Sequence, residues 1–200
     1  MFSSENSIVR ASLLFSDNLR GLVTNDNVLE IVSSFLSTDV FQLQLQNANK
    51  VESEQGHFQA NWHRDLPYQH WTSSRPISCN VFYPIDDFTE ENGATLLLPY
   101  SQHFPDFPSK EFAEKYSVSA TAARGSAIIF DSMLYHRAGR NRSNSSRWGV
   151  NNVYTQPFLK QQIDLTDSMN EEGLSDRERT LFGFTYKTPS SVEGFLNRKG

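Results

Sequence analysis

The stretch ANWHRDLPYQHW, residues 60–71, sets a histidine and an aspartate among large aromatic side chains. His63 and Asp65 stand two positions apart, and alternate residues of an extended segment point to the same side. An imidazole nitrogen and a carboxylate oxygen can therefore face one point, either as a hydrogen-bonded surface pair or as two ligands of a metal ion. With five histidines and eleven aspartates in 200 residues, such a pair arises by chance in about one sequence in four, so it needs independent support.

A third ligand has to come from another part of the chain. The segment GSAIIFDSMLYH, residues 125–136, predicts a buried strand and a turn that lead directly to His136. Two imidazoles and one carboxylate on one face of a metal leave the other positions open, which is typical of non-haem Fe(II) oxygenases. His63, Asp65 and His136 are therefore the candidate ligands. The remaining histidines are expected to be structural or solvent-exposed: His57, His70 and His103.

Arg147 supplies the independent support. It follows His136 by eleven residues and begins the predicted strand RWGVNNVYTQ, residues 147–156. If the strands that carry His136 and Arg147 pair, the guanidinium comes close to the metal. Its planar fork matches a carboxylate. An oxygenase that uses 2-oxoglutarate needs such a cation for the far carboxylate of the keto acid.

The segments before this site predict one helix and one strand. NDNVLEIVSSFLST, residues 25–38, has apolar residues at helical spacing: Val28, Ile31, Val32, Phe35 and Leu36. DVFQLQLQNA, residues 39–48, alternates, which predicts a half-buried strand. Its apolar residues, Phe41, Leu43 and Leu45, would share one face. The glutamines on the other face fit a wet cavity as well as solvent.

The rest of the chain predicts many short strands and few helices. We expect a turn at EENG, residues 90–93, where Gly93 takes a positive φ. Further helices are expected at 109–116 and near 175–183. Such a pattern favours one antiparallel sandwich or barrel with a helical fringe. The other predicted strands lie at 76–85, 93–99, 116–123 and 125–131.

Composition limits the classes of function. Two hundred residues with 38% hydrophobic side chains suit a single domain over residues 1–200. The net charge of −5 disfavours non-specific nucleic-acid binding, and the single cysteine excludes an internal disulfide. No signal peptide or membrane span is evident, so the expected compartment is the cytoplasm. The expected partner is a small-molecule substrate, without nucleic acid or membrane, and the oligomeric state is left open.

Three motifs in order resemble the phytanoyl-CoA dioxygenase family of Fe(II)/2-oxoglutarate oxygenases. They are His63-Arg64-Asp65, TEENGATLLLPYSQH at residues 89–103, and His136 followed by Asn141, Ser143 and Arg147. The ending RERTLFGFTYKTPSSVEGFL, residues 177–196, is also similar to that family. The resemblance runs from about residue 25 to about residue 197, and the combination is specific where each motif alone is not.

The resemblance implies a mainly β fold, a double-stranded β-helix (a jelly-roll or cupin-like barrel) with flanking α-helices. It implies Fe(II) bound by His63, Asp65 and His136, with 2-oxoglutarate and dioxygen as cosubstrates. Arg147 would bind the far carboxylate of the keto acid, and Phe82 and Arg64 would lie beside that molecule. The expected activity is hydroxylation of a small organic substrate with release of succinate and CO2. Related halogenases replace the carboxylate ligand by a small residue, so Asp65 favours hydroxylation over halogenation.

The chain departs from the family pattern in three places. Ala138 stands where the family often has a hydroxyl residue that contacts the cosubstrate, and PYSQH replaces a Pro-Gly-Ser-His segment. Members also usually carry several dozen residues ahead of this starting point, so we expect an oxygenase domain without that N-terminal segment. Two alternatives remain at this stage. One is an inactive or non-catalytic jelly-roll protein that binds a small molecule. The other is a zinc hydrolase, which would give Arg147 no task.

Overall fold

The computed structural model of the protein describes residues 7–53, 58–66 and 72–197. His57 and His70 lie outside the described residues, as do Tyr68 and Trp71 from the end of the opening stretch. The strands are β1 (Ile8–Arg10), β2 (Gln42–Val51), β3 (Ser78–Pro84), β4 (Leu96–Leu97), β5 (Val118–Ser119), β6 (Ile128–Asp131), β7 (His136–Arg137) and β8 (Arg147–Thr155). The helices are α1 (Asp17–Val23), α2 (Asp26–Leu36), α3 (Lys110–Tyr116), α4 (Asp176–Leu181) and α5 (Val192–Asn197). Short 3-10 turns lie at Ser12–Leu14, Phe58–Ala60, Ser101–His103 and Leu165–Asp167.

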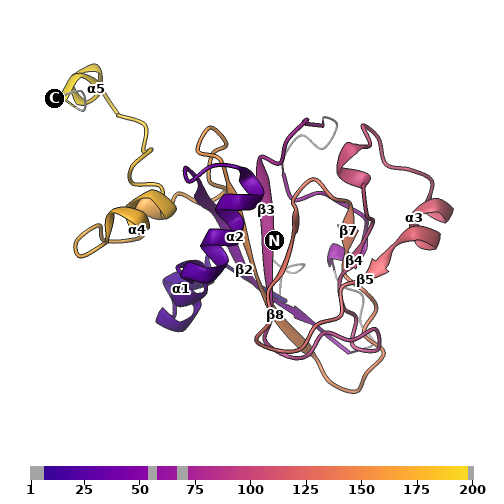
Figure 1. The fold of residues 1–200 in the computed structure, drawn as a ribbon. Helices are drawn as coiled ribbons and strands as arrows, with labels where there is room; N and C mark the ends of the chain where they lie inside the picture. Colours follow the sequence, from indigo (N-terminus) through magenta and orange to yellow (C-terminus); the bar gives the residue numbers. More distant parts are fainter. Residues whose placement is uncertain (1–6, 54–57, 67–71, 198–200) are drawn as a thin grey trace.

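Two antiparallel sheets face each other across the molecule (Figure 1). The larger has the strand order β1-β2-β8-β3-β6 and the smaller the order β5-β4-β7. From β3 onward the chain passes back and forth between them, because β3 and β4, β5 and β6, β6 and β7, and β7 and β8 belong to different sheets. This is the predicted double-stranded β-helix. Every strand predicted from the sequence is present, although β4 and β5 are only two residues long.

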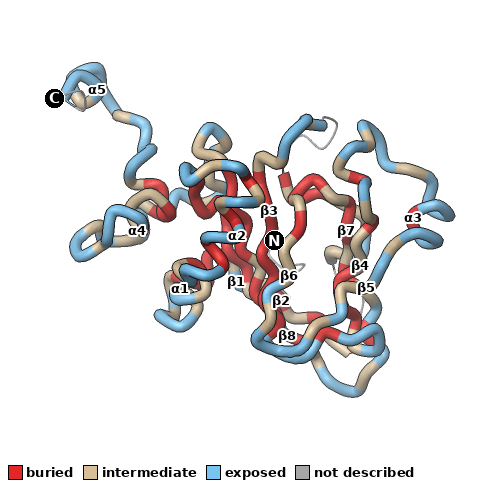
Figure 2. Tube along the Cα trace, viewed as in Figure 1, coloured by how far each residue is buried: buried red, intermediate tan, exposed pale blue. Residues whose placement is uncertain are grey.

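Helices α1 and α2 cover the outer face of the larger sheet (Figure 1), and the buried residues concentrate there and on the sheet itself (Figure 2). Asn25 caps α2, because its side chain accepts a hydrogen bond from the backbone N–H of Val28 at 3.2 Å. The buried face of the helix is Val28, Leu29, Val32 and Leu36. The predicted face was wrong at Ile31, which is 52% exposed, because Leu29 is turned toward the sheet instead.

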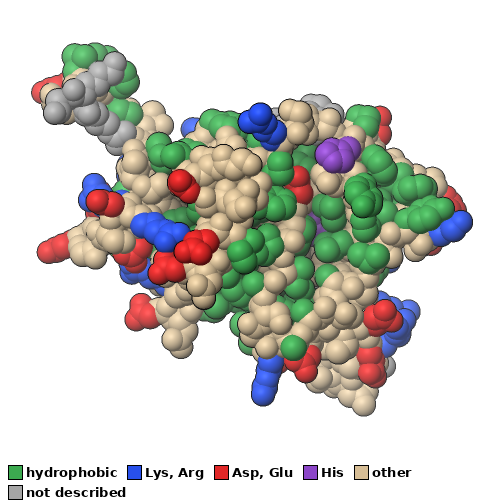
Figure 3. Space-filling model, viewed as in Figure 1, with side chains coloured by type: hydrophobic (Ala, Val, Ile, Leu, Met, Phe, Trp, Pro, Cys, Tyr) green, Lys and Arg blue, Asp and Glu red, His purple; other side chains and the backbone are tan. Residues whose placement is uncertain are grey.

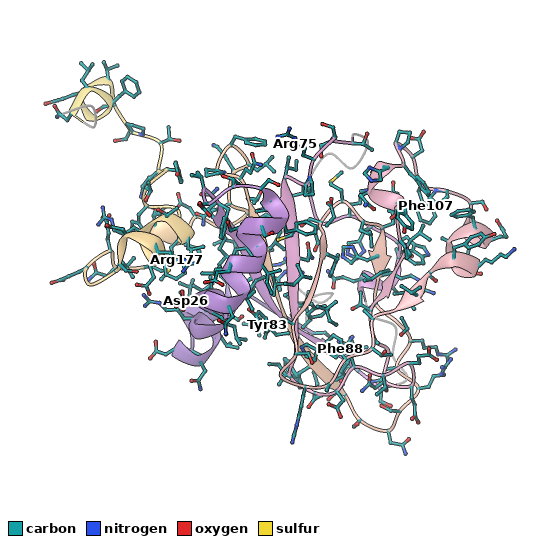
Figure 4. All side chains as sticks on the ribbon, viewed as in Figure 1. Asp26, Arg75, Tyr83, Phe88, Phe107 and Arg177 are labelled. Atoms are coloured by element: carbon teal, nitrogen blue, oxygen red, sulfur yellow. The ribbon has the colours of Figure 1, made fainter. Side chains whose placement is uncertain are left out.

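The C-terminal part of the chain returns to this helical layer. An ion pair of 2.7 Å joins Arg177 of α4 to Asp26 of α2, and Figure 4 shows the two side chains meeting. Arg20 and Glu178 form a second ion pair at 3.0 Å. Helix α5 lies apart from the rest of the molecule (Figure 1). Within the described residues, no helix is long and apolar enough to cross a membrane.

Strand β2 differs from its prediction. Its register with β8 shifts between Leu43 and Leu45, so a bulge at Gln44 exchanges the two faces of the strand. Leu43 packs in the core under the helices, whereas beyond the bulge Gln46 turns to that side and donates to Leu19 O of α1 at 2.8 Å. The strand is also buried on both faces, and its glutamines are satisfied there: Gln42 and Gln44 donate to the carbonyls of Leu159 and Lys160. The expected half-buried strand was therefore wrong.

The space between the sheets is filled at one end by a separate apolar cluster of Phe82, Phe88, Ala94 and Phe130. Outside the smaller sheet a further cluster forms around Leu98, Ala113 and Tyr135. Hydrophobic side chains also gather on the surface over α3 and the smaller sheet (Figure 3), where residues such as Phe107, Phe112 and Tyr116 are exposed. The inner cluster leaves a polar pocket between the sheets, and that pocket holds the candidate site.

Candidate metal centre

His63, Asp65 and His136 come together between the two sheets. His63 and His136 form an isolated antiparallel bridge, in which each backbone N–H donates to the carbonyl of the other residue at 3.0 Å. Asp65 N donates to Ser132 O at 3.1 Å, which fixes the carboxylate beside the turn before β7. The extended segment through residues 63–65 forms only this bridge and no longer strand. The alternation that turns both side chains inward still holds.

The ligand atoms of these residues surround one point. Asp65 Oδ1 lies 3.6 Å from His63 Nε2 and 3.5 Å from His136 Nε2, and the three ligand atoms all lie within 4.8 Å of one another. Each histidine Nδ1 lies 2.9 Å from a backbone carbonyl, Asn61 O for His63 and Leu134 O for His136. Those carbonyls can only accept, so the proton sits on Nδ1 and the Nε2 lone pair is free for a metal.

The donor set fits a first-row divalent metal. Metal bonds to histidine nitrogen and carboxylate oxygen measure about 2.0–2.2 Å, so adjacent ligands of an octahedral ion lie about 3 Å apart. The observed separations of 3.5 and 3.6 Å differ from that value by about half an ångström, which small side-chain rotations close. Two nitrogens and one oxygen on one side leave the opposite side open toward the pocket.

The electrostatics favour a carboxylate and a neutral imidazole. Burial alone raises the pKa of Asp65, but the adjacent His136, His63 and the amide of Asn80 lower it well below its usual range. Burial and then the neighbouring His136 lower the pKa of His63. For His136 burial lowers the pKa, and the contact with Asp65 more than offsets this, so its pKa is raised.

Arg147 reaches the same pocket by a different route from the one predicted. Its strand β8 pairs with β2 and β3 in the larger sheet, whereas β7, with His136, pairs with β4 in the smaller. The predicted pairing of these two strands was therefore wrong. The two side chains meet because the sheets face each other, and both line one pocket.

The guanidinium of Arg147 is buried with most of its hydrogen-bonding capacity unused. The residue is 1% exposed, and Nη2 donates to Gly93 O at 2.9 Å. That carbonyl belongs to the predicted turn, in which Gly93 takes a φ of +79°. Among the described residues, no acceptor reaches Nε or Nη1. Burial lowers the pKa of Arg147 to about 10, with Asp86 acting weakly in the opposite direction. An anion in the pocket would satisfy both nitrogens.

Two aromatic rings enclose this cation. The guanidinium carbon lies 3.9 Å from the ring centroid of Phe88 and 6.0 Å from that of Phe82. Figure 4 shows Phe88 at the end of the space between the sheets. Gly149 makes this packing possible, because a Cβ there would lie 2.6 Å from Phe88 Cζ and 2.7 Å from Phe82 Cε2. Phe82 also lines the pocket. Phe88 was missed, since no periodic pattern marks it within its loop.

Arg64 lies elsewhere. The alternation that turns its neighbours inward turns Arg64 outward. Its Nε donates to Met133 O at 2.7 Å, and Nη2 donates to Ser101 O at 2.7 Å and Phe104 O at 2.6 Å. Its guanidinium carbon lies 4.0 Å from the Tyr135 ring centroid. These contacts hold loops outside the barrel, and the structure does not place Arg64 at the predicted position beside the cosubstrate.

The loop between β7 and β8 explains the remaining motif residues. Asn141 is fully buried, and its Nδ2 donates to Val51 O at 3.1 Å and to Ser145 O at 2.8 Å. Ser143 donates to Asn141 Oδ1 through its backbone N–H and its hydroxyl. This loop therefore fixes the start of β8, and with it Arg147. Ala138 lines the pocket, so the position that departs from the family pattern does face the candidate site.

Comparison with known sequences identifies the family. A sequence profile described as phytanoyl-CoA dioxygenase (PhyH) matches residues 1–149, a range that contains the three candidate ligands and Arg147. The chain belongs to the phytanoyl-CoA dioxygenase family. The resemblance noted in the sequence is thus confirmed, and it places the protein in a family of non-haem oxygenases.

Relatives of this family member come from bacteria and fungi. An uncharacterized protein of Mycobacterium tuberculosis is 32% identical over 213 residues, covering 99% of this chain and 77% of that protein. The dioxygenase olcK of Penicillium canescens is 28% identical over 168 residues, covering 78% of this chain and 54% of that enzyme. The chain therefore spans about half the length of this fungal relative.

Solved structures show the same fold. The non-heme alpha-ketoglutarate-dependent epimerase SnoN from nogalamycin biosynthesis superposes with a TM-score of 0.64 at 18% identity, over 84% of this chain and 70% of that one. EctD from S. alaskensis, in a structure with bound Fe, also gives a TM-score of 0.64 at 18% identity, over 78% of this chain and 59% of that one. The chain therefore shares the jelly-roll fold of these two proteins.

Proposed function

We propose that this protein is an Fe(II)/2-oxoglutarate-dependent dioxygenase that hydroxylates a small organic substrate. His63, Asp65 and His136 hold the iron, and Arg147 binds the C5 carboxylate of 2-oxoglutarate. Phe82 and Phe88 line the place where the keto acid lies. The overall reaction converts substrate C–H, 2-oxoglutarate and O2 into substrate C–OH, succinate and CO2. Iron and 2-oxoglutarate, when bound, supply the oxidation, and the protein chain supplies position and shelter from water.

The unsatisfied guanidinium of Arg147 carries this proposal. A buried cation with two nitrogens that have no acceptor among the described residues is unfavourable unless an anion joins it. Its fork matches a carboxylate, and it lines one pocket with His63 and His136. A dicarboxylate with a keto group beside one end can chelate the metal and reach Arg147 with the other end. A zinc hydrolase with the same ligands would leave this cation without a function.

The neighbouring aromatic rings suit the hydrocarbon part of such a molecule. Phe82 and Phe88 cover the guanidinium on its apolar side, so an anion approaches Arg147 from the metal side. Asn49 and Thr95 add polar atoms to the pocket wall. The site thus binds charge at one end, apolar chain in the middle and metal at the other end. The carboxylate ligand Asp65 fills the position that a halide would otherwise take, which favours hydroxylation.

Anaerobic titration with Fe(II) and 2-oxoglutarate tests the proposal directly. The wild type should develop the weak visible charge-transfer band of the chelate, and His63→Ala should not. Arg147→Ala loses two charge-assisted hydrogen bonds, each contributing about 1.5 kcal/mol, so the apparent Kd for 2-oxoglutarate should rise about 100-fold. The matched control is Arg140→Ala, an exposed arginine of the same β7–β8 loop, which should titrate like the wild type.

Admission of oxygen supplies the second measurement. Wild-type protein should form succinate slowly even without its substrate, and succinate should appear in equal amount to CO2. If the wild type shows neither the band nor succinate, the dioxygenase assignment fails. Metal-dependent turnover that needs no oxygen would point to a hydrolase, and ligand binding without iron uptake would point to a binding protein.

A further inference from the structure

Two asparagine amides hold the far oxygen of Asp65. Asn80 Nδ2 donates to Asp65 Oδ2 in a short hydrogen bond, and Asn151 Nδ2 donates to the same oxygen at 3.3 Å. The other oxygen, Oδ1, is the one that faces both histidine nitrogens. Asn80 lies on β3 and Asn151 on β8, and the two amides also bond to each other at 3.3 Å. The carboxylate is therefore gripped on the side away from the metal.

Two buried hydroxyls fix the orientation of the Asn80 amide. Ser132 Oγ donates to Asn80 Oδ1 at 2.6 Å, so the amide cannot turn over without losing that bond. Ser78 Oγ lies 2.8 Å from Ser132 Oγ and 2.8 Å from Tyr154 O, and its single proton can serve either. Asn80, Ser78 and Ser132 have no solvent exposure. Water therefore cannot replace these bonds, and Asn80 Nδ2 stays directed toward the carboxylate of Asp65.

We propose that Asn80, with Asn151, restricts Asp65 to binding the metal through one oxygen. This inference rests on the proposed function. A carboxylate that binds through both oxygens fills one more metal position than a carboxylate that binds through one. Two histidines and a one-oxygen aspartate leave three octahedral positions, which is the number that a bidentate keto acid and dioxygen need together. Asn80 and Ser132 are thus positioning residues, acting on cosubstrate binding through Asp65.

The contacts explain why asparagine is required at a position inside an apolar strand. Asn80 sits in SCNVFYP, where the alternate residues Cys79, Val81 and Tyr83 pack under the helices. An apolar residue at 80 would pack as well but would leave Oδ2 of Asp65 with only the longer hydrogen bond from Asn151. That oxygen would then be free to turn toward the nearest cation, which is the metal. Ligand orientation by such outer contacts changes metal-site affinity or activity by about 10- to 100-fold.

Replacement of iron by Co(II) tests the inference without turnover. The visible absorption of Co(II) depends on its coordination number, and 2-oxoglutarate binding can be titrated through it. Asn80→Leu keeps the side-chain size and removes the amide. We expect its Co(II) spectrum to differ from that of the wild type and its Kd for 2-oxoglutarate to rise about 10- to 100-fold. Co(II) affinity should stay equal or increase, because Asp65 gains a bond to the metal.

Two further variants separate positioning from folding. Ser132→Ala removes a single oxygen, lets the Asn80 amide turn over, and should weaken 2-oxoglutarate binding in the same direction by a smaller factor. Asn152→Leu is the matched control. Asn152 lies on β8 and is fully buried, as Asn80 is on β3, but it faces the helices, where it donates to Leu22 O at 3.0 Å. It should lower the melting temperature and leave the Co(II) spectrum and the Kd unchanged.

Each outcome has a distinct meaning. If Asn80→Leu and Ser132→Ala bind 2-oxoglutarate within twofold of the wild type, with the wild-type Co(II) spectrum, the amides only support the fold and the inference is overturned. If Asn152→Leu weakens 2-oxoglutarate binding as much as Asn80→Leu does, the effect is general destabilisation. If the wild type takes up neither Co(II) nor 2-oxoglutarate, the proposed function fails and this inference fails with it.

Discussion

Arg147→Met is expected to leave the ligand-free protein at least as stable as the wild type, although it removes a large buried side chain. The reason is the unsatisfied charge. Burial lowers the pKa of Arg147 to about 10, more than two pH units below the ordinary pKa of arginine, and at about 1.36 kcal/mol per pH unit this corresponds to about 3 kcal/mol of destabilisation. Methionine fills similar space and needs no hydrogen bonds. Removing a buried charge in favour of an apolar residue is often neutral or stabilising.

The favourable contacts that Arg147→Met loses contribute less free energy than the buried charge costs. The variant gives up the hydrogen bond to Gly93 O and the contact with the Phe88 ring, which together contribute about 2 kcal/mol. The net expectation is a gain of about 1 kcal/mol, or roughly 2–4 °C in melting temperature for a chain of this size. The folded pKa is the lower one, so the charge destabilises the wild type fully below about pH 10. The wild type recovers this stability as the pH rises from there toward the ordinary pKa of arginine.

Thermal melts with and without ligand provide the assay. With Mn(II) in place of Fe(II) and 2-oxoglutarate at about 100 times its Kd, the wild type should gain about 2.7 kcal/mol, or roughly 5–11 °C. Arg147→Met should gain no more than Mn(II) alone provides, and exposed Arg140→Met should behave like the wild type. The reasoning is refuted if Arg147→Met loses more than about 2 kcal/mol without ligand, or if 2-oxoglutarate stabilises it as much as the wild type.

Three further predictions concern packing and backbone. Gly149→Ala should lower the free energy of unfolding in urea by about 1–3 kcal/mol, because its Cβ would lie 2.6 Å from Phe88 Cζ, and unchanged stability would show that the ring moves freely. Arg64→Lys should lower the free energy of unfolding by about 2–4 kcal/mol, because an ammonium cannot donate to all three carbonyls that the guanidinium serves. Its Co(II) affinity should change only a few-fold, and a strong loss of Co(II) binding would contradict the structural role. Tyr100→Gly should raise stability by about 1 kcal/mol in thermal melts, because Tyr100 holds a φ of +66° and its side chain is 76% exposed. A destabilised variant would mean that the ring makes a contact that the fold needs.

The sequence by itself predicted many of the elements and the residues of the candidate site, although α1, α5 and β1 were not predicted. Helix α2 follows from apolar spacing and the Asn25 cap, and β3 and β8 follow from runs of apolar and β-branched residues. These signals are local, so they survive any arrangement of the rest of the chain. His63, Asp65 and His136 could be selected because few residue types bind iron. Arg147 was found by its chemistry, although the strand pairing expected for it was wrong.

Other features exist only in the folded molecule. The bulge at Gln44 reverses the faces of β2, and nothing in the alternating pattern of that segment announces it. Phe88 meets Arg147 from a loop, and Asn80 meets Asp65 and Ser132 across 15 and 52 residues of chain. A buried asparagine within an apolar strand was a signal that a polar partner exists, but not which one. The periodicity of a segment indicates which side of an element is buried. Which residue packs against that side depends on how the two sheets face each other, and this arrangement is a property of the whole chain.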